Sequence, residues 1–529
     1  MSKIIHTLQE FASNSGDLPA LRGDNNAFSY SDMLAAVHTL ADELTTLGIE
    51  RVGLAADNGP EWIIVDLACQ LANVPLIPLP GFFTPQQMRH AVESSGVDAL
   101  LSDRDGFAST CATLFGARLS GGAVTFASLT SISAFRLCPL LDSVLLPDNT
   151  AKITYTSGST GHPKGVCLSV AAQYATASAL NDALKETPLH RHLAVLPLAT
   201  LLENVAGVYS ALLRGAEVVL PGLANLGWAG SSGLDIQALA STLTATTPDS
   251  AVLLPQILKG LICARESGKW PAPTSLKFLA VGGARVAPDL IERGRQLGLP
   301  VYEGYGLSEC GSVVSVNRPG ADKPGSAGKI LPHCAVTIVA AEVLVSGNTY
   351  QGYLQHDIGA PSFTEVSTGD LGELDEDGFL WLRGRSKNLL VNSYGRNISP
   401  EWPESELSAL PSILQVMVIG DAQAFCSALI YPAPGASKSD ISHDIALCNT
   451  NLPDYAQIRR WAALPNALSV ADGLLTANGR LRRNEILTHY ASLVDDCYSD
   501  VLNPETNEIT MQCLSVVSAN TARTDMAEE

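Results

Sequence analysis

Residues 154–166, T-Y-T-S-G-S-T-G-H-P-K-G-V, constrain the fold and function of this chain more than any other stretch. The apolar, β-branched residues around Ile153 and Tyr155 predict a strand that runs into a loop. Glycines in this loop let the backbone approach a ligand and turn successive N–H groups inward, while the hydroxyl side chains add donors. Because Lys164 adds a positive charge, the loop suits a polyphosphate.

Two other interpretations of this loop compete with that one. A Walker loop needs Gly-Lys followed by Ser or Thr at the start of a helix. Here Pro163 precedes Lys164 and Gly165 follows it, so the loop is not of that type. A flexible, solvated Gly/Ser linker is the plainer alternative, but linkers seldom carry a single Lys-Gly pair after a proline at the end of a strand.

Composition excludes several function classes. The chain has 529 residues, of which 46% are hydrophobic and 16% charged, so it can bury a large core and form more than one domain. A formal charge of −20 argues against nucleic acid or an anionic membrane surface as the main partner. Eleven scattered cysteines without a C-x-x-C pair indicate thiols in a reducing compartment. No apolar run reaches membrane-span length, and we expect a soluble, cytoplasmic protein without integral membrane contact.

The first 150 residues alternate short apolar runs with amphipathic helical stretches, which predicts an α/β fold with a largely parallel sheet. Residues 31–47, for example, place apolar side chains at helical spacing. Thr84 followed by Pro85 resembles a helix N-cap with proline at the first helical position.

The pattern changes in the second half of the chain. Residues 335–382 form closely spaced short strands with Gly and Asp turns, which we interpret as a small β-barrel. The pattern of residues 387–490 predicts a compact α+β unit. We therefore expect a large domain of αβ layers plus the barrel at 1–386, a small mobile C-terminal lid at 387–490, and an extension at 491–529 whose end is disordered.

Two glycine-rich segments could hold a nucleotide base. Val281-Gly282-Gly283-Ala284-Arg285 ends a predicted buried strand, and bare backbone there lets a flat ring lie close, although a tight strand-to-helix turn explains it equally well. In the segment 302–309, Gly304 and Gly306 bracket Tyr305, a ring suited to stacking on a base. Ser308 offers a donor near a reacting carboxylate or phosphate, and Glu309 a hard oxygen ligand for Mg²⁺. A surface turn is the alternative for this second segment.

Two charged segments follow. Asp370 comes after Gly369 and can accept both hydroxyls of a ribose, as acidic residues do in dinucleotide sites. Arg385 lies one turn and one strand later, so it could return beside Asp370; an ordinary Asp–Arg surface pair is the alternative. Asn478-Gly479 predicts a tight turn that presents Arg480 and the arginines after it, unless these form only a solvated basic patch.

These five segments, in this order, resemble the adenylate-forming (AMP-binding, acyl-activating) enzyme superfamily from about residue 20 to residue 490. The segment Gly384–Leu407 looks most like long-chain fatty acyl-CoA synthetases. The resemblance implies that a carboxylate attacks the α-phosphate of ATP to give acyl-AMP and pyrophosphate, and that a thiol then displaces AMP. ATP, Mg²⁺ and CoA are the implied cofactors.

The resemblance also implies roles for single residues. Glu309 would hold Mg²⁺, Ser308 would lie near the α-phosphate, and Lys387 would be the hinge of the C-terminal domain. Glu309, Arg480, Lys164 and Ser308 would be catalytic. The implied nucleotide-binding residues are Thr156, Ser157, Gly158, Ser159, Thr160, Gly161, Lys164, Gly283, Ala284, Tyr305, Gly306, Ser308, Asp370 and Arg385.

Two positions depart from the family pattern. Arg480 stands where the family has its catalytic lysine, and arginine keeps the charge but is bulkier and differs in geometry. Thr200 stands where relatives often have His or an aromatic residue that helps gate the acyl pocket. Small residues at 206, 207, 210 and 211 could leave room for a long aliphatic tail, or could pack against a neighbouring helix.

The sequence thus predicts an acid–thiol ligase that activates a carboxylic acid, expected to be a medium- or long-chain fatty acid, and transfers it to CoA. One alternative has an acyl carrier protein as the acceptor. Another, suggested by Arg480, is a nucleotide-binding homologue with impaired chemistry.

Overall fold

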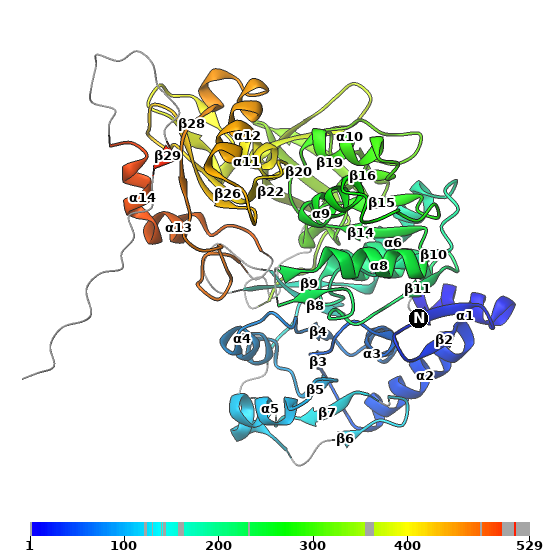
Figure 1. Ribbon diagram of the computed structural model, residues 1–529. Helices are drawn as coiled ribbons and strands as arrows, with labels where there is room; N and C mark the ends of the chain where they lie inside the picture. The colour runs from blue at the N-terminus through cyan, green and yellow to red at the C-terminus, as the bar shows by residue number, and fades with distance from the viewer. Residues whose placement is uncertain are drawn as a thin grey trace, which may run out of the picture. The chain divides into compact units, whose positions relative to one another are not determined.

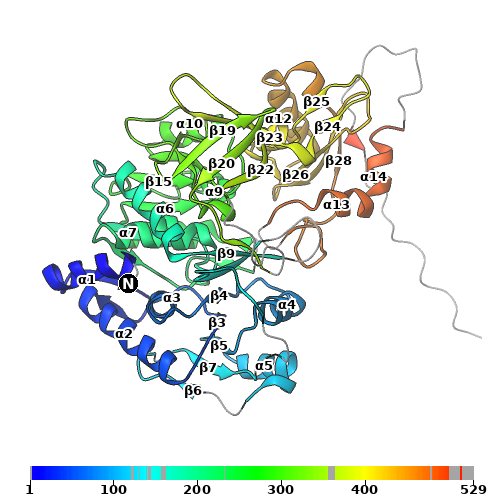
Figure 2. The ribbon, with the colours of Figure 1, turned by 180° about the vertical axis from the view of Figure 1, so that it is seen from behind.

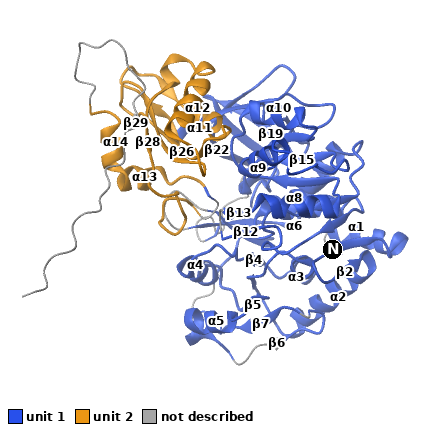
Figure 3. Cartoon of the chain, in the orientation of Figure 1, with its two compact units in different colours: residues 1–386, 477–479 blue, residues 387–476, 480–529 orange. Residues whose placement is uncertain are grey.

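The computed structural model describes residues 3–120, 124–129, 131–138, 140, 144–156, 163–230, 233–354, 364–476 and 479–499, and the backbone of 513–514. The chain forms two compact units, shown in two colours in Figure 3: unit 1 is 1–386 with 477–479, and unit 2 is 387–476 with 480–529. Several residues of the sequence analysis lie outside the described ones, namely Ser157, Gly158, Ser159, Thr160, Gly161, Asn478 and the end of the C-terminal extension.

The first sheet of unit 1 has nine strands within the described residues, and its centre is parallel. In spatial order the strands are β18 (Lys329–Ile330), β17 (Ser315–Val316), β16 (Val301–Tyr305), β15 (Phe278–Val281), β14 (Ser250–Leu253), β10 (Arg191–Leu193), β11 (Glu217–Val219), β1 (Pro19–Arg22) and β2 (Ala27–Ser29). Because β15 and β16 run parallel with Val281 opposite Glu303, the glycine-rich segments after both strands lie at one edge of the sheet.

The second sheet of unit 1 carries the strand before the predicted polyphosphate loop. Its described strands are, in order, β21 (Gly352–Tyr353), β9 (Lys164–Leu168), β8 (Lys152–Thr156), β4 (Leu76–Pro78), β3 (Val52–Leu54), β5 (Ala99–Ser102), β7 (Ser133–Arg136) and β6 (Val124–Thr125). The pairs among β8, β4, β3 and β5 are parallel, as the alternating pattern of the first 150 residues predicted. The antiparallel hairpin β8–β9 brackets the loop, with Thr156 opposite Lys164.

The third sheet of unit 1 comes from the region that was expected to form a small β-barrel. Its strands β19 (Cys334–Val339), β20 (Glu342–Gly347), β22 (Glu365–Leu374) and β23 (Leu380–Arg385) form a four-stranded antiparallel sheet in that order. Among the described residues these four strands form an open sheet, and no closure into a barrel is seen there. Unit 1 also contains a short antiparallel ribbon of β12 (Trp228–Ala229) and β13 (Gly233–Leu234).

Helices cover the sheets of unit 1, and α1 and α2 lie side by side in both views (Figures 1 and 2). The helix α3 is buried from Pro60 to Gln70, as its almost wholly apolar sequence requires. Thr84 caps α4 through a capping box with Gln87, and Pro85 is the first helical residue, as predicted. The helices are α1 (Lys3–Ser15), α2 (Tyr30–Thr46), α3 (Pro60–Ala72), α4 (Pro85–Ser95), α5 (Phe107–Phe115), η1 (Gly116–Arg118), α6 (Val170–Ala183), the π-helix η2 (Leu202–Tyr209), α7 (Ser210–Leu212), α8 (Ile236–Thr246), α9 (Pro255–Glu266), α10 (Pro288–Gln296) and η3 (Ser308–Cys310).

Unit 2 is an α+β unit with a sheet between two apolar layers. Alternate residues of β26 point to opposite sides, so Val416 and Val418 join one cluster while Met417 and Ile419 join the other. Its strands are β24 (Leu390–Val391), β25 (Asn397–Ile398), β26 (Ile413–Ile419), β27 (Cys426–Pro432), β28 (Ile458–Ala463) and β29 (Cys513–Leu514). Its helices are α11 (Glu401–Ser408), α12 (Lys438–Thr450), η5 (Asp454–Ala456), α13 (Arg483–His489) and α14 (Ala491–Asp496), and η4 (Ser386–Asn388) spans the boundary.

The predicted fold class is confirmed: a large α/β unit precedes a small α+β unit. In the part of the chain that the structure describes, no helix combines the length and apolar character needed to cross a membrane.

Candidate functional site

Asp370 is the centre of a polar cluster in unit 1. The antiparallel pairing of β22 with β23 places Asp370 directly opposite Arg385, and the Arg385 Nε lies 2.9 Å from the Asp370 Oδ1. The hydroxyl of Tyr305, at the end of β16, donates to the Asp370 Oδ2 at 2.7 Å. Only 6% of Asp370 is exposed. The structure thus brings three of the residues named from the sequence into contact.

The backbone around Asp370 holds its carboxylate in a fixed orientation. The Thr368 hydroxyl accepts from the Asp370 N–H at 3.0 Å and donates to the Val343 carbonyl at 2.8 Å. The Gly369 N–H donates to the Glu342 carboxylate at 3.0 Å. Burial, together with the nearby Asp370 charge, raises the pKa of Tyr305, so this hydroxyl stays protonated and remains a donor.

The glycine-rich segments after β15 and β16 lie beside this cluster. A Cβ on Gly306 would come 1.7 Å from the Ser312 carbonyl oxygen, so no side chain fits there. Close backbone packing therefore accounts for Gly306 without any ligand. Gly283 and Ala284 are different, because both are exposed and Gly283 has a φ of 82°. These two residues form an accessible turn, which is compatible with both interpretations made from the sequence.

Tyr353 joins two further residues predicted from the sequence. Its hydroxyl donates to the Glu309 Oε1 at 2.8 Å, and the Lys164 Nζ lies 5.1 Å from the centre of its ring. Tyr353 reaches this place because β21 pairs with β9, which starts at Lys164. Sequence reasoning missed Tyr353, since the pairing joins strands far apart in the chain and no local pattern marks it.

The donor set around Glu309 fits a magnesium ion that also binds a nucleotide. Among the described residues, no group of three or more His, Cys, Asp or Glu side chains could hold a metal ion. Mg²⁺ typically takes one or two carboxylates and completes its shell with phosphate oxygens and water. Glu309 in the short helix η3 could supply that single carboxylate, with the other ligands coming from the nucleotide and solvent.

Two protein-family models match this chain. A model of the AMP-binding enzyme matches residues 8–354, and a model of the AMP-binding enzyme C-terminal domain matches residues 387–502. The chain belongs to the AMP-binding enzyme family. The family resemblance noted in the sequence is therefore confirmed.

Individual relatives of this AMP-binding enzyme differ in the acids that they are named for. The long-chain-fatty-acid–CoA ligase FadD15 of Mycobacterium bovis is 26% identical, over 86% of this chain and 90% of that protein. The structure of the anthranilate CoA ligase AuaEII with anthranoyl-AMP has a TM-score of 0.77 at 18% identity, covering 92% of this chain and 96% of that one. The o-succinylbenzoate CoA synthetase of Bacillus subtilis with ATP and magnesium has a TM-score of 0.72 at 22% identity, covering 90% and 98%. These two structures establish the fold.

The cations predicted in the C-terminal unit of this AMP-binding enzyme have different surroundings. Arg483 pairs with the buried Glu404, and Arg482 donates to the Gly473 carbonyl at 3.0 Å, so both stabilise the unit itself. Arg480 stands exposed on a hairpin closed by the Leu475–Leu481 bridge. Lys387, the residue predicted to be a hinge, is exposed and is the first residue of unit 2. Arg480 and Lys387 thus belong to unit 2, and the other predicted site residues belong to unit 1.

A buried histidine and a buried glutamate pair at β10. His192 lies on β10 and is buried, with its Nε2 2.9 Å from the Glu203 Oε1 and its Nδ1 3.0 Å from the Ser250 hydroxyl. Glu203 also accepts the N–H groups of residues 195 and 196. A Cβ on Gly207 would come 2.2 Å from Glu203, so the small size of residue 207 serves this packing and not a ligand.

Glu303 carries a buried carboxyl group next to the site. It lies on β16, its Oε2 has no hydrogen-bond partner among the residues that the structure describes, and burial raises its pKa from 4.5 to about 8, with Arg285 opposing the shift. Between these two pH values the folded protein keeps a proton that the unfolded chain has lost. The free energy of unfolding therefore falls as the pH rises through this window.

We expect Glu303→Gln, which mimics the protonated form, to remove this pH dependence. Relative to the variant, the wild type should lose up to about 1.4 kcal/mol of stability per pH unit between about pH 5 and pH 8. Urea unfolding at several pH values measures this difference. Glu292→Gln on the exposed face of α10 is the matched control, and a parallel pH profile for wild type and Glu303→Gln would contradict the assignment.

Proposed function

We propose that this AMP-binding enzyme is an ATP-dependent acid–thiol ligase, and the observation that carries the proposal is the fixed carboxylate of Asp370. Arg385 contacts the Oδ1 of Asp370, and the Tyr305 hydroxyl donates to its Oδ2, so each carboxylate oxygen has one protein partner from this pair. Because an ionised carboxylate has about four lone-pair positions, each oxygen can still accept one ribose hydroxyl. A buried carboxylate held in one orientation is suited to recognising the two neighbouring hydroxyls of a nucleoside.

In this proposal, the other site residues bind the base, the phosphates and the metal ion that accompanies them. Gly283, Ala284 and Tyr305 flank the adenine, and Ser308 lies near the α-phosphate. Thr156, Ser157, Gly158, Ser159, Thr160, Gly161 and Lys164 hold the β- and γ-phosphates. Glu309 holds Mg²⁺, which would neutralise phosphate charge when bound. The contacts that support this assignment are those of Tyr353 with Glu309 and Lys164, which bring the metal and polyphosphate positions together.

The chemistry then consists of two displacements. The acid carboxylate oxygen attacks the α-phosphorus, an acyl–O–P bond forms, the bond to the bridging oxygen breaks, and pyrophosphate leaves. The thiolate of CoA next attacks the acyl carbon and AMP leaves. The protein contributes positioning and charge stabilisation, not a covalent intermediate of its own. Arg480 supplies positive charge during adenylation, and the C-terminal unit turns about Lys387 between the two steps.

We propose a medium- or long-chain fatty acid as the substrate. Leu202 and Ala206 of η2 pack with Ala280 and Tyr302 in an apolar cluster, and all four are only partly buried. Ala280 and Tyr302 lie just before the glycine-rich segments, so this apolar cluster adjoins the proposed adenylate position. The hydroxyl of Thr200 donates to the Pro197 carbonyl, which satisfies it locally. The likeness to FadD15 supports an aliphatic acid, whereas the two similar structures bear the names of aryl acids.

We also propose that the protein works in the cytoplasm and that CoA is its thiol partner. All ten cysteines that the structure describes are free thiols, which suits the reducing cytoplasm. The acceptor proposed here is CoA, and an acyl carrier protein is the alternative acceptor to be tested.

The deciding experiment measures pyrophosphate release with Mg²⁺-ATP across acids from acetate to palmitate and across aryl acids, with and without CoA. We expect release to peak with long chains and acyl-CoA to form with AMP in equal amounts. Release of pyrophosphate without formation of acyl-CoA would show that the acceptor is a thiol other than that of CoA. A peak of release with aryl acids would overturn the fatty-acid assignment. Measurable ATP binding without release for any acid would overturn the ligase proposal itself.

A further inference from the structure

The helix α4 contacts both flanks of the proposed polyphosphate loop. On one flank, the Tyr155 hydroxyl lies 3.1 Å from the Ala91 carbonyl oxygen and 2.5 Å from the Ser94 hydroxyl. On the other flank, the His90 Nε2 lies 3.1 Å from the Pro163 carbonyl oxygen. Tyr155 is near the end of β8 and Pro163 comes directly before β9, so one helix is tied to the residues on either side of the loop.

The contact of His90 with Pro163 has a defined direction. A carbonyl oxygen only accepts hydrogen bonds, so the His90 Nε2 must carry the proton and donate. The Pro163 carbonyl belongs to the planar peptide group that also contains the Lys164 N–H. Holding the carbonyl oxygen therefore fixes the orientation of this peptide plane and the direction in which the Lys164 N–H points.

The His90 ring also packs against Tyr155, which lies on the other side of the loop. It meets the Tyr155 ring edge-on, with 5.9 Å between the ring centres and 76° between the planes. Tyr155 is 7% exposed, and burial raises the pKa of its hydroxyl, which stays protonated. His90 is thus the one residue in these contacts that touches both Tyr155 and Pro163.

We propose that His90 is a positioning residue for Lys164. The inference rests on the proposed function, because it takes Lys164 to bind the β- and γ-phosphates of ATP. Holding the Pro163 carbonyl and the Tyr155 ring fixes the start of β9, from which the Lys164 side chain extends, so Lys164 loses less conformational freedom when the phosphates bind. AMP lacks these two phosphates and is held through its ribose and base, so its binding does not depend on His90.

Affinities for ATP and AMP, measured by calorimetry on the full chain, test this proposal with two variants of His90. His90→Phe keeps an aromatic ring against Tyr155 but cannot donate to Pro163, and His90→Gln keeps a donor but loses the ring. We expect His90→Phe to bind ATP about tenfold more weakly, as for one lost positioned hydrogen bond, and AMP within about twofold of wild type. His90→Gln should retain most of the ATP affinity.

Two comparison variants separate this role from a general structural one. Arg89→Ala changes the neighbouring residue on the exposed face of α4 and should leave both affinities unchanged. Asp370→Ala removes the proposed ribose contact and should weaken ATP and AMP together. Equal losses of ATP and AMP affinity in His90→Phe, or unchanged ATP affinity, would overturn the role of His90. If the wild type binds neither nucleotide, the proposed function fails first and this inference fails with it.

Discussion

Arg480→Ala is expected to lower the rate of acyl-adenylate formation by about 100-fold or more while ATP affinity changes little. The guanidinium group carries a full charge at all working pH values and offers a planar fork of donors to phosphate and carboxylate oxygens. Charge that develops only in the transition state is not yet present in the ATP complex. Removing a group that stabilises such charge typically costs about two to three orders of magnitude in turnover.

Three measurements check this expectation. Pyrophosphate release gives the adenylation rate, calorimetry gives the ATP affinity, and transfer from supplied acyl-AMP to CoA gives the second step alone. Arg480→Lys, which restores the residue type expected from the family, should retain or raise the adenylation rate. If Arg480→Ala released pyrophosphate as fast as the wild type, Arg480 would have no catalytic role.

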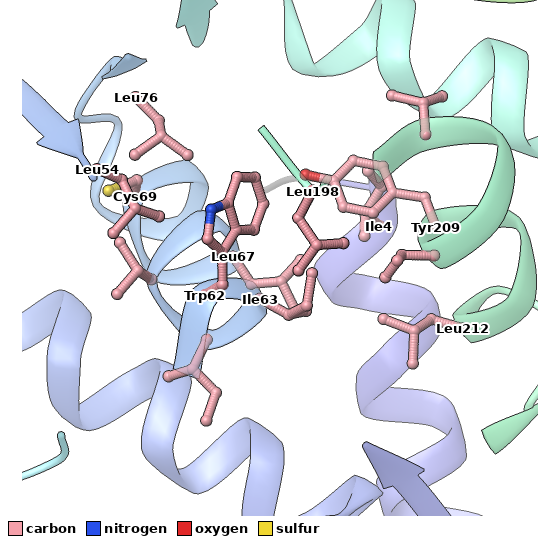
Figure 4. Packing of buried hydrophobic residues seen from close by; sticks show 14 of the residues in the cluster. Ile4, Leu54, Trp62, Ile63, Leu67, Cys69, Leu76, Leu198, Tyr209 and Leu212 are labelled. Atoms are coloured by element: carbon pink, nitrogen blue, oxygen red, sulfur yellow. The ribbon is translucent and has the colours of Figure 1, made fainter. Parts of the chain in front are cut away.

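Lys152→Met is expected to destabilise unit 1 by about 3 to 5 kcal/mol, because it leaves a buried carboxylate without its countercharge. The Lys152 Nζ lies 2.9 Å from the Asp66 Oδ2 and contacts the Asn204 side chain, and neither Lys152 nor Asp66 is more than 1% exposed. Burial lowers the pKa of Lys152 while the Asp66 charge opposes this shift. The core around the pair is apolar, and Figure 4 shows Trp62 and Tyr209 within it.

The unfolding of unit 1 can be followed by tryptophan fluorescence in urea, since the Lys152 Nζ lies 5.8 Å from the centre of the Trp62 ring. The double variant Lys152→Met/Asp66→Asn should recover much of the loss, because an amide still accepts from Tyr209 and carries no charge. Lys185→Met, at an exposed lysine, is the matched control. A single variant as stable as the wild type would show that the pair is not needed for stability.

The fold class and the family were accessible from local patterns. Helical spacing over residues 31–47 and the capping sequence at Thr84 correspond to α2 and α4, because such signals act over a few residues. The facing positions of Asp370 and Arg385 were also within reach, since a short hairpin brings back a residue one turn and one strand later. The pattern of residues 335–382 predicted closely spaced short strands, which the structure shows, but strand spacing does not reveal whether such a sheet closes.

The alternation of strands and helices and the order of the motifs depend on near neighbours in the chain, so local sequence was enough to predict both. Only the tertiary structure brought Tyr353 beside Glu309 and Lys164, paired His192 with Glu203, and buried Lys152 against Asp66. Each of these contacts joins segments that share no turn or short hairpin. Their partners are chosen by the packing of whole sheets and helices, so no local pattern can identify them.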